Sequence, residues 1–393
     1  MEMAGAFKFS RIPEIHFGTG SSEKAVSLAV RFGERMLLVT GKSSFSNSKR
    51  GKRLLYDLDA AGIKYDIISV SGEPVTTFID KSASVFREQP PDVIVAAGGG
   101  SVVDAGKALS AIIPVPGKTS DYLEGNPVRT AHPGTRLPFI ALPTTAGTGS
   151  EVTKNAVLSA PGAPAHKSSL RHDNFAPDIA VVDPVLAAGC PPDITAASGL
   201  DALTQLLEAF TSTTASGMTD ALAFSGLERG FGSIRKAVED GGDLSARSDM
   251  AYAAMLSGIA LANAGLGAVH GFASVLGGYY KIPHGVICGT LLGAVTRANI
   301  SKLKGSDGSS ICLKKYSAAG RLICKKENKS DDYYIMSLCD ELEKLIMELD
   351  IPRLGRYGIT RDDAGKLAME TGIKNNPVNL DKDELKAILV SRL

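Results

Sequence analysis

The 393-residue chain contains no long uninterrupted apolar run, because glycine and proline interrupt its longest apolar stretches. A membrane-spanning helix needs about 20 consecutive apolar residues, so we predict no membrane span. The segment from Met1 to Glu14 also lacks the apolar centre of a secretory signal peptide, so we do not expect export.

Cysteine is scarce, with five residues and no paired spacing. This pattern disfavours a disulfide framework and is typical of reduced thiols, which predicts a cytoplasmic protein. The net charge is only +1, with acidic and basic residues interspersed. Without a basic stripe we predict no nucleic-acid partner, and without an acidic tail we expect no solvating segment.

The apolar fraction of 44% is that of an ordinary globular protein, and the length predicts two or more domains. Up to residue 190, short apolar strands alternate with amphipathic helices, which predicts an α/β domain with a parallel sheet. From Pro191 helical periodicity continues almost to Leu393. We therefore predict an α/β domain over residues 1–190 and an all-α domain over residues 191–393, with Pro191-Pro192 at the boundary.

A glycine triplet follows the most strand-like run of the first domain. Val93 to Ala97 is predicted as a strand buried on both faces, Gly98 to Gly100 end it, and Ser101 caps a helix that continues through Lys107. Backbone N–H groups at such a helix start favour a phosphate, and glycine permits its close approach. A tight turn that needs glycine only for its dihedral angles accounts for the same residues.

Two further polar loops follow predicted strands. Gly41 to Ser44 follow the strand Met36–Thr40, and a Thr/Gly/Ser-rich segment from Pro143 to Thr153 follows the strand Leu137–Leu142. Ligands of parallel sheets bind at the carboxyl ends of strands, so one shared ligand is favoured over three unrelated turns. The intervening segments are predicted as a helix to about Ala61, a strand over Tyr65–Val70 and a helix over residues 76–88.

The helical half carries a second group of polar residues. Asp201 and Gln205 are four residues apart and share a helix face. His270 and His284 would lie about 21 Å apart on one unbroken helix, but Gly277-Gly278 and Pro283 predict a break that brings them together. One carboxylate and two imidazoles form a common divalent-metal set, whereas each histidine alone can equally be a hydrogen-bonded core residue.

In this order, the motifs resemble the iron-containing (group III) alcohol dehydrogenase family, within the dehydroquinate-synthase-like fold. The resemblance runs nearly end to end. The segments that carry it are Pro13–Gly18, Gly98–Asp104, Pro143–Ser150, Gly199–Leu203 and His270–His284.

The resemblance implies a Rossmann-like nucleotide-binding domain followed by a metal- and substrate-binding domain. The implied activity is an NAD(P)-dependent, metal-assisted dehydrogenase of small alcohols and aldehydes that forms a homodimer or larger homo-oligomer. Iron(II) or zinc would be held by Asp201, His270, His284 and, at the fourth position, Gln205. The implied cofactor-binding residues are Gly98, Gly99, Gly100, Ser101, Asp104, Thr144, Thr145, Thr148, Asn155 and Lys167.

Two departures from the family pattern keep alternatives open. Gln205 stands where the family usually has a histidine ligand, and a neutral amide oxygen is a weaker ligand for transition metals. Ser274 stands where many members have a second histidine near the substrate. A metal-independent reductase of the maleylacetate reductase type is therefore an alternative, followed by a dehydroquinate-synthase-like lyase and a non-catalytic nucleotide-binding protein.

A third departure concerns the cofactor. NAD-preferring members tend to place an aspartate after the strand Leu37–Thr40, where this chain has Gly41 followed by Lys42, Ser43 and Ser44. Without the carboxylate, a 2′-phosphate meets no repulsion, and a lysine with two hydroxyls can bind it. This predicts that the preferred cofactor is NADP(H), with NAD also possible. The alternative is a turn that tolerates both cofactors.

Overall fold

The computed structural model describes residues 6–160, 166–306 and 310–393. Contacts within the chain divide it into two compact units. The sheet unit comprises Ser10–Thr145 and Gly149–Cys190, and the helical unit comprises Pro191–Leu393 with residues 6–9 and Ala146–Thr148.

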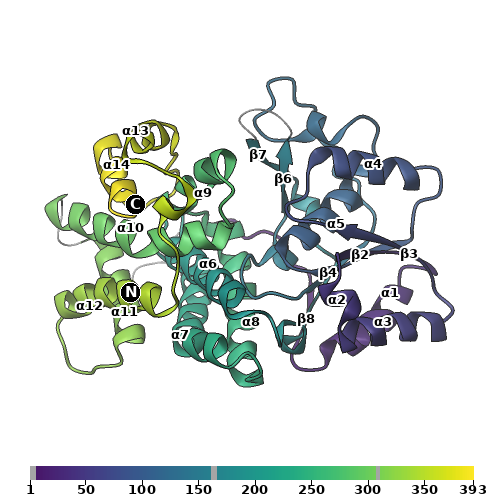
Figure 1. The fold of residues 1–393 in the computed structure, drawn as a ribbon, viewed down its shortest axis with the longest axis horizontal. Helices are drawn as coiled ribbons and strands as arrows, with labels where there is room; N and C mark the ends of the chain where they lie inside the picture. The colour runs from purple at the N-terminus through teal and green to yellow at the C-terminus, as the bar shows by residue number, and fades with distance from the viewer. Residues whose placement is uncertain (1–5, 161–165, 307–309) are drawn as a thin grey trace. The chain divides into compact units, whose positions relative to one another are not determined.

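The sheet unit is built on six parallel strands in the order β1-β8-β5-β4-β2-β3 (Figure 1). This confirms the predicted α/β class. The strands are β1 (Glu14–Phe17), β2 (Arg35–Gly41), β3 (Lys64–Val70), β4 (Val93–Gly98), β5 (Phe139–Pro143) and β8 (Ile179–Val182). The helices are α1 (Ala25–Val30), α2 (Ser44–Asn47), α3 (Lys49–Ala60), α4 (Thr76–Phe86) and α5 (Gly100–Ile112).

Helices cover both faces of this sheet, as the apolar strands require. In β2, Leu37 and Val39 pack into the cluster that contains α4 and α5. Met36 and Leu38, which point to the opposite face, pack into the cluster that contains α1 and α3. Figure 1 shows α4 and α5 on one side of the strands and α1 and α3 on the other.

The strand order places a topological switch point between β2 and β4. From β2 the chain passes outward to β3, then crosses back to β4 on the other side of β2 and continues to β5. Ligands of open α/β sheets bind at the carboxyl ends of strands beside such a point. Gly41 ends β2 and Gly98 ends β4, so two of the three predicted polar loops begin there.

Two local predictions for these loops were wrong. Ser101 does not cap α5, because the extended backbone of Gly99 serves as the N-cap and the helix starts at Gly100. The helix predicted from Ser44 to Ala61 is two helices. The backbone of Ser48 is extended, and its hydroxyl accepts the Gly51 N–H, so Ser48 ends α2 and caps α3.

An antiparallel hairpin of β6 (Asn155–Ala160) and β7 (His166–Arg171) was not predicted. Two contacts of α5 fix its first strand. Asp104 accepts the Val157 N–H at 3.1 Å, and Lys107 Nζ donates to the Asn155 carbonyl at 2.8 Å. Because these partners lie about 50 residues away in the chain, a local sequence pattern cannot reveal them.

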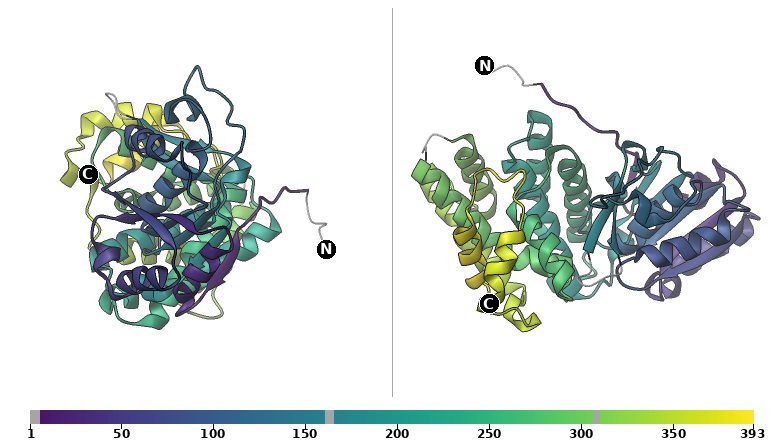
Figure 2. Two further views of the ribbon diagram at one scale, coloured as in Figure 1. Left: turned by 90° about the vertical axis from the view of Figure 1, so that its right-hand side faces the viewer. Right: turned by 90° about the horizontal axis from the view of Figure 1, so that it is seen from above.

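The helical unit contains nine α-helices among its described residues. They are α6 (Pro192–Thr211), α7 (Gly217–Glu239), α8 (Leu244–Ala264), α9 (Ala268–Tyr279), α10 (His284–Ser306), α11 (Ile311–Cys324), α12 (Asp331–Glu348), α13 (Arg361–Glu370) and α14 (Lys382–Val390). Figure 2 shows the C-terminal helices, in yellow, against the green helices of this unit, and α9, α10, α13 and α14 share one apolar core.

No single helix of the described residues is long and apolar enough to cross a membrane. The consecutive helices α8 and α9 reach the necessary length and apolar composition only together, and the chain bends by 99° between them.

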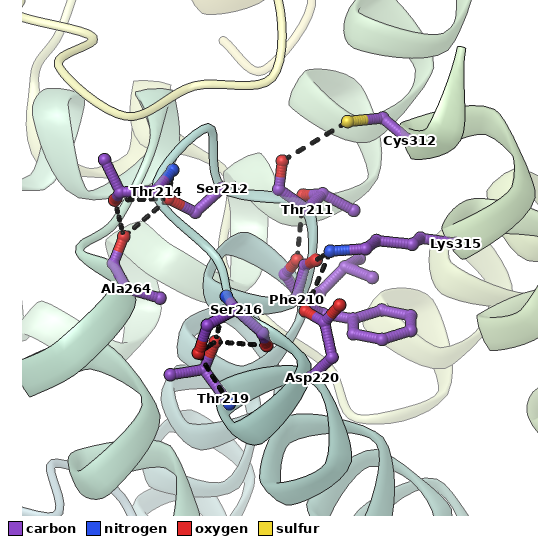
Figure 3. A network of polar contacts seen from close by, with 11 residues as sticks. Phe210, Thr211, Ser212, Thr214, Ser216, Thr219, Asp220, Ala264, Cys312 and Lys315 are labelled. Carbon is purple, nitrogen blue, oxygen red and sulfur yellow. Dashed lines mark hydrogen bonds and ion pairs between the residues drawn. The ribbon is translucent and has the colours of Figure 1, made fainter. Parts of the chain in front are cut away.

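Side chains of α11 contact carbonyl groups at the C-terminal end of α6 (Figure 3). Lys315 Nζ donates to the Phe210 carbonyl at 2.7 Å and pairs with Asp220 at 2.8 Å, while the Cys312 thiol approaches the Thr211 carbonyl at 3.6 Å. A cation at a helix C-terminus satisfies carbonyls without intrahelical partners and complements the helix dipole. These contacts anchor the helix that presents Asp201.

Candidate metal centre and nucleotide-binding loops

Three helices of the helical unit bring the predicted metal ligands together. Asp201 lies in the middle of α6, His270 in the first turn of α9, and His284 at the start of α10. The predicted break between the histidines exists, but Gly277-Gly278 do not make it, because both lie inside α9. The chain turns at Tyr280–Pro283 instead, where proline cannot continue a helix.

The imidazole and carboxylate groups face one another closely. The His270 and His284 ring centroids are 5.5 Å apart. Asp201 Oδ1 lies 3.4 Å from His270 Nε2 and 3.6 Å from His284 Nε2. Cys288, which was not among the predicted ligands, completes a group whose four donor atoms all lie within 4.8 Å of one another.

The residues fit a divalent ion. Asp201 is only 2% exposed, yet no group among the described residues makes a hydrogen bond to its Oδ1. The two imidazole nitrogens lie beyond the usual 2.7–3.2 Å range of N–H···O bonds. A buried carboxylate oxygen without a donor is costly unless a cation neutralises it. Imidazole, carboxylate and thiolate are all ligands of zinc, so the donor set suits a transition-type metal.

Glu208 fixes the orientation of His270. One carboxylate oxygen of Glu208 lies 2.6 Å from His270 Nδ1, and the other accepts the Val269 N–H at 2.7 Å. An Nδ1–H that donates to Glu208 leaves the Nε2 lone pair for the Asp201 side of the ring. A carboxylate behind a histidine is the usual partner of a metal-binding imidazole. Glu208 was not predicted as a site residue, although it lies seven residues after Asp201 on the same face of α6.

Asp201 and Glu208 place negative charge beside the two imidazoles. Nearby Cys288 raises the pKa of His284 to about 9 against the effect of burial, and Asp201 adds to this rise. Burial alone would raise the pKa of Asp201, but the two imidazoles outweigh it and lower that pKa. The pKa of His270 is raised well above its usual value although burial acts in the opposite direction, because Cys288, Asp201 and Glu208 surround it. A divalent ion would replace the protons that this charge attracts.

Gln205 was predicted as the fourth ligand, and its side-chain oxygen already has a partner. It is 3% exposed, and its Oε1 accepts the hydroxyl of Ser257 in α8 at 2.7 Å.

Cys288 lies four residues after His284 on α10 and therefore shares its helix face. That spacing was available in the sequence, but only packing against α6 shows that this face meets Asp201.

The predicted nucleotide-binding residues of the sheet unit line the carboxyl ends of neighbouring strands. β4 pairs with β2 on one side and β5 on the other, so Gly41, Gly98 and Thr144 follow or end adjacent strands. A Cβ at Gly98 would lie 2.6 Å from the Val102 side chain, and a Cβ at Gly99 would lie 3.4 Å from Thr145 Oγ1. Glycine at Gly98 is therefore required by the packing of the turn itself.

Other predicted cofactor contacts have partners within the protein. Asp104 accepts the Ser150 hydroxyl at 2.5 Å, and Lys167 pairs with Glu73 at 2.5 Å. The Asn155 carbonyl accepts from Lys107, while Lys42, Ser43 and Ser44 are exposed. Thr148 belongs to the helical unit, unlike Thr144 and Thr145. The roles of these residues in cofactor binding stay predictions, as do those of Gly100 and Ser101.

Comparison with known proteins identifies the family. Residues 13–184 match the family described as iron-containing alcohol dehydrogenase, and residues 195–393 match its C-terminal family. The chain belongs to this family. The earlier resemblance is thereby confirmed, and the chain is an alcohol dehydrogenase of the iron-containing family, an oxidoreductase.

Three similar proteins match over nearly their whole length. The chain is 33% identical to an NADPH-dependent butanol dehydrogenase of Clostridium saccharobutylicum, over 97% of this chain and 96% of that protein. The solved structure of a 1,3-propanediol oxidoreductase is 31% identical with a TM-score of 0.89, covering 99% of this chain and 100% of that one. The iron-containing alcohol dehydrogenase of Thermococcus thioreducens is 27% identical with a TM-score of 0.84, covering 98% and 99%.

Membership in the iron-containing alcohol dehydrogenase family implies a divalent metal and a nicotinamide cofactor. The cluster around Asp201 supplies donor groups for the metal, and the loops at the ends of β2, β4 and β5 supply candidate contacts for the nicotinamide cofactor.

Proposed function

We propose that this alcohol dehydrogenase interconverts small alcohols and aldehydes with NADP(H) and depends on a divalent metal held by Asp201, His270 and His284. The observation that carries the proposal is the buried Asp201 oxygen, which has no hydrogen bond among the described residues and lies within 3.6 Å of two imidazole nitrogens. The relatives that are named as butanol and propanediol enzymes support a small alcohol as substrate.

The residues of this chain would hold and orient the reacting groups. A bound divalent ion supplies Lewis acidity toward a substrate oxygen, and the nicotinamide supplies or accepts the hydride. Glu208 keeps the His270 ring in one tautomer by accepting its Nδ1–H, and Asp201 contributes the negative charge that attracts the ion. The glycine turn before α5 offers backbone N–H groups to the pyrophosphate.

Metal removal tests the central part of this proposal. We expect about one metal ion per chain in protein purified without chelator. NADPH oxidation with a panel of small aldehydes should be lost after chelation and restored by iron(II) or zinc, because the Lewis acid is lost and regained. Metal analysis paired with this assay measures both.

Full turnover in metal-free, chelator-treated protein would contradict the proposal. Such a result would favour a metal-independent reductase, the alternative that Gln205 at a histidine position supports.

The preference for NADP(H) is supported by Gly41 at the switch point and by exposed Lys42 beside two serines. A Cβ at Gly41 would meet only Ser44 Oγ at 3.6 Å and Val102 at 4.0 Å, so a side chain fits there. Gly41→Asp should lower the ratio of kcat/KM for NADPH over NADH about tenfold or more, a change of about 1.4 kcal/mol, because its carboxylate repels the 2′-phosphate.

Gly41→Asn is the matched control for this prediction. It has nearly the same shape without the charge, so its NADPH to NADH ratio should stay near that of the wild-type protein. A ratio that falls equally in both variants, or in neither, would contradict recognition of the 2′-phosphate at this loop.

A further inference from the structure

A sulfur atom, Cys288 Sγ, completes the group of donor atoms around Asp201. Cys288 is fully buried, and its Sγ lies 3.7 Å from His270 Nε2 and 3.6 Å from His284 Nε2. Both histidines thus present the same ring nitrogen to Asp201 Oδ1 and to Cys288 Sγ. Three helices contribute to this arrangement, since Cys288 and His284 share α10 while Asp201 and His270 lie on α6 and α9.

These separations match the edges of a tetrahedral metal site. With metal–nitrogen and metal–oxygen distances of about 2.05 Å and a metal–sulfur distance of about 2.3 Å, neighbouring nitrogen and oxygen ligands lie about 3.4 Å apart, and nitrogen and sulfur about 3.5 Å apart. The structure has 3.4 and 3.6 Å between nitrogen and oxygen, and 3.7 and 3.6 Å between nitrogen and sulfur. Four of the six ligand–ligand separations thus match a site for one ion, and the other two are at most 4.8 Å. An ion held by all four atoms would take a substrate oxygen as a fifth ligand.

Gln205, by contrast, is engaged elsewhere. Its Oε1 accepts the hydroxyl of buried Ser257 at 2.7 Å. Coordination through this oxygen would add a weak neutral ligand, whereas Cys288 offers a thiolate, which transition metals such as zinc bind more strongly.

We propose that Cys288, rather than Gln205, is the fourth protein ligand of the metal, which gives this enzyme an Asp/His/His/Cys site. The inference rests on the proposed metal-dependent function. On binding, the Cys288 thiol releases its proton to solvent and its sulfur forms a bond to the ion, so no oxidant or reductant is needed. A soft thiolate also favours zinc over a hard oxygen-preferring cation such as magnesium.

Cobalt(II) reports sulfur coordination directly. The full-length protein is freed of metal with a chelator, loaded with one equivalent of cobalt(II), and its near-ultraviolet absorption is recorded. A cobalt–thiolate bond gives a charge-transfer band that nitrogen and oxygen ligands do not give. We expect this band in the wild-type protein, in Gln205→Ala and in Cys324→Ser, a control at a thiol outside the cluster, and we expect its loss in Cys288→Ser.

Zinc titration provides a readout that does not depend on activity. Cys288→Ser should weaken zinc binding about a hundredfold or more, since loss of a group that only orients a ligand already costs about 10–100-fold. Gln205→Ala should lose much less zinc affinity.

The outcomes separate this inference from the proposed function. Wild-type protein that binds one cobalt ion without the charge-transfer band overturns sulfur ligation, while a chelator-sensitive activity would still support metal dependence. A loss of zinc affinity in Gln205→Ala as large as that in Cys288→Ser overturns the choice of sulfur over the amide. The wild-type spectrum decides the question even if Cys288→Ser does not fold.

Discussion

Replacing Gly285 by alanine should weaken metal binding about a hundredfold, a loss of about 2.7 kcal/mol. A Cβ at this position would lie 2.3 Å from the carbonyl oxygen of Ala197 and 2.6 Å from its carbonyl carbon. These are backbone atoms of α6 that cannot rotate away, so the start of α10 must move. His284 is the preceding residue, and Asp201 lies one turn after Ala197, so the movement separates two ligands.

Competition between the metal-free protein and a coloured zinc chelator measures this affinity. Gly232→Ala in α7 is the matched control, because its Cβ would meet no atom within 4 Å and metal binding should be unchanged. Thermal unfolding of each variant shows whether the helical unit is intact. Wild-type zinc affinity in a folded Gly285→Ala protein would contradict the requirement for close contact between α6 and α10.

Replacing Lys107 by methionine should destabilise the sheet unit by about 2–5 kcal/mol. The side chain is 1% exposed, and its Nζ lies within hydrogen-bond distance of four oxygen atoms. They are Ser150 O at 2.7 Å, Asn155 O at 2.8 Å, Thr153 Oγ1 at 3.0 Å and Ser150 Oγ at 3.1 Å. Burial lowers the pKa of Lys107 to about 8, so the ammonium is still the main form at pH 7.

Methionine keeps the apolar stem of Lys107 but donates no hydrogen bond, so the carbonyls of Ser150 and Asn155 lose this donor. The same residues hold the start of β6, where Asn155 is a predicted cofactor contact, so NADPH binding should weaken together with stability. Urea unfolding followed by circular dichroism and NADPH titration by fluorescence measure the two effects.

Lys81→Met in the neighbouring helix α4 is the control, because Lys81 is exposed and its replacement should change neither property. A Lys107→Met protein with wild-type unfolding midpoints would show that the four contacts contribute nothing net to stability.

The sequence by itself was sufficient to predict the fold class. β2 and β4 are short apolar runs that alternate with amphipathic helices, and this pattern has few solutions other than a parallel sheet covered on both faces. The polar loops at Gly41, Gly98 and Pro143 could likewise be located, because strand ends are visible in a hydropathy pattern. The family motifs then led to Asp201, His270 and His284.

Only the tertiary structure brought Cys288 into the candidate metal site and placed Glu208 behind His270. Helical spacing tells which residues share a face, but it does not tell what that face meets. The face of α10 that carries His284 and Cys288 reaches Asp201 because Gly285 allows close contact with the backbone of α6. The hairpin of β6 and β7 was likewise beyond prediction, since Lys107 and Asp104 hold it through contacts between distant parts of the chain. Local periodicity determines elements, whereas long-range packing decides which side chains share a site.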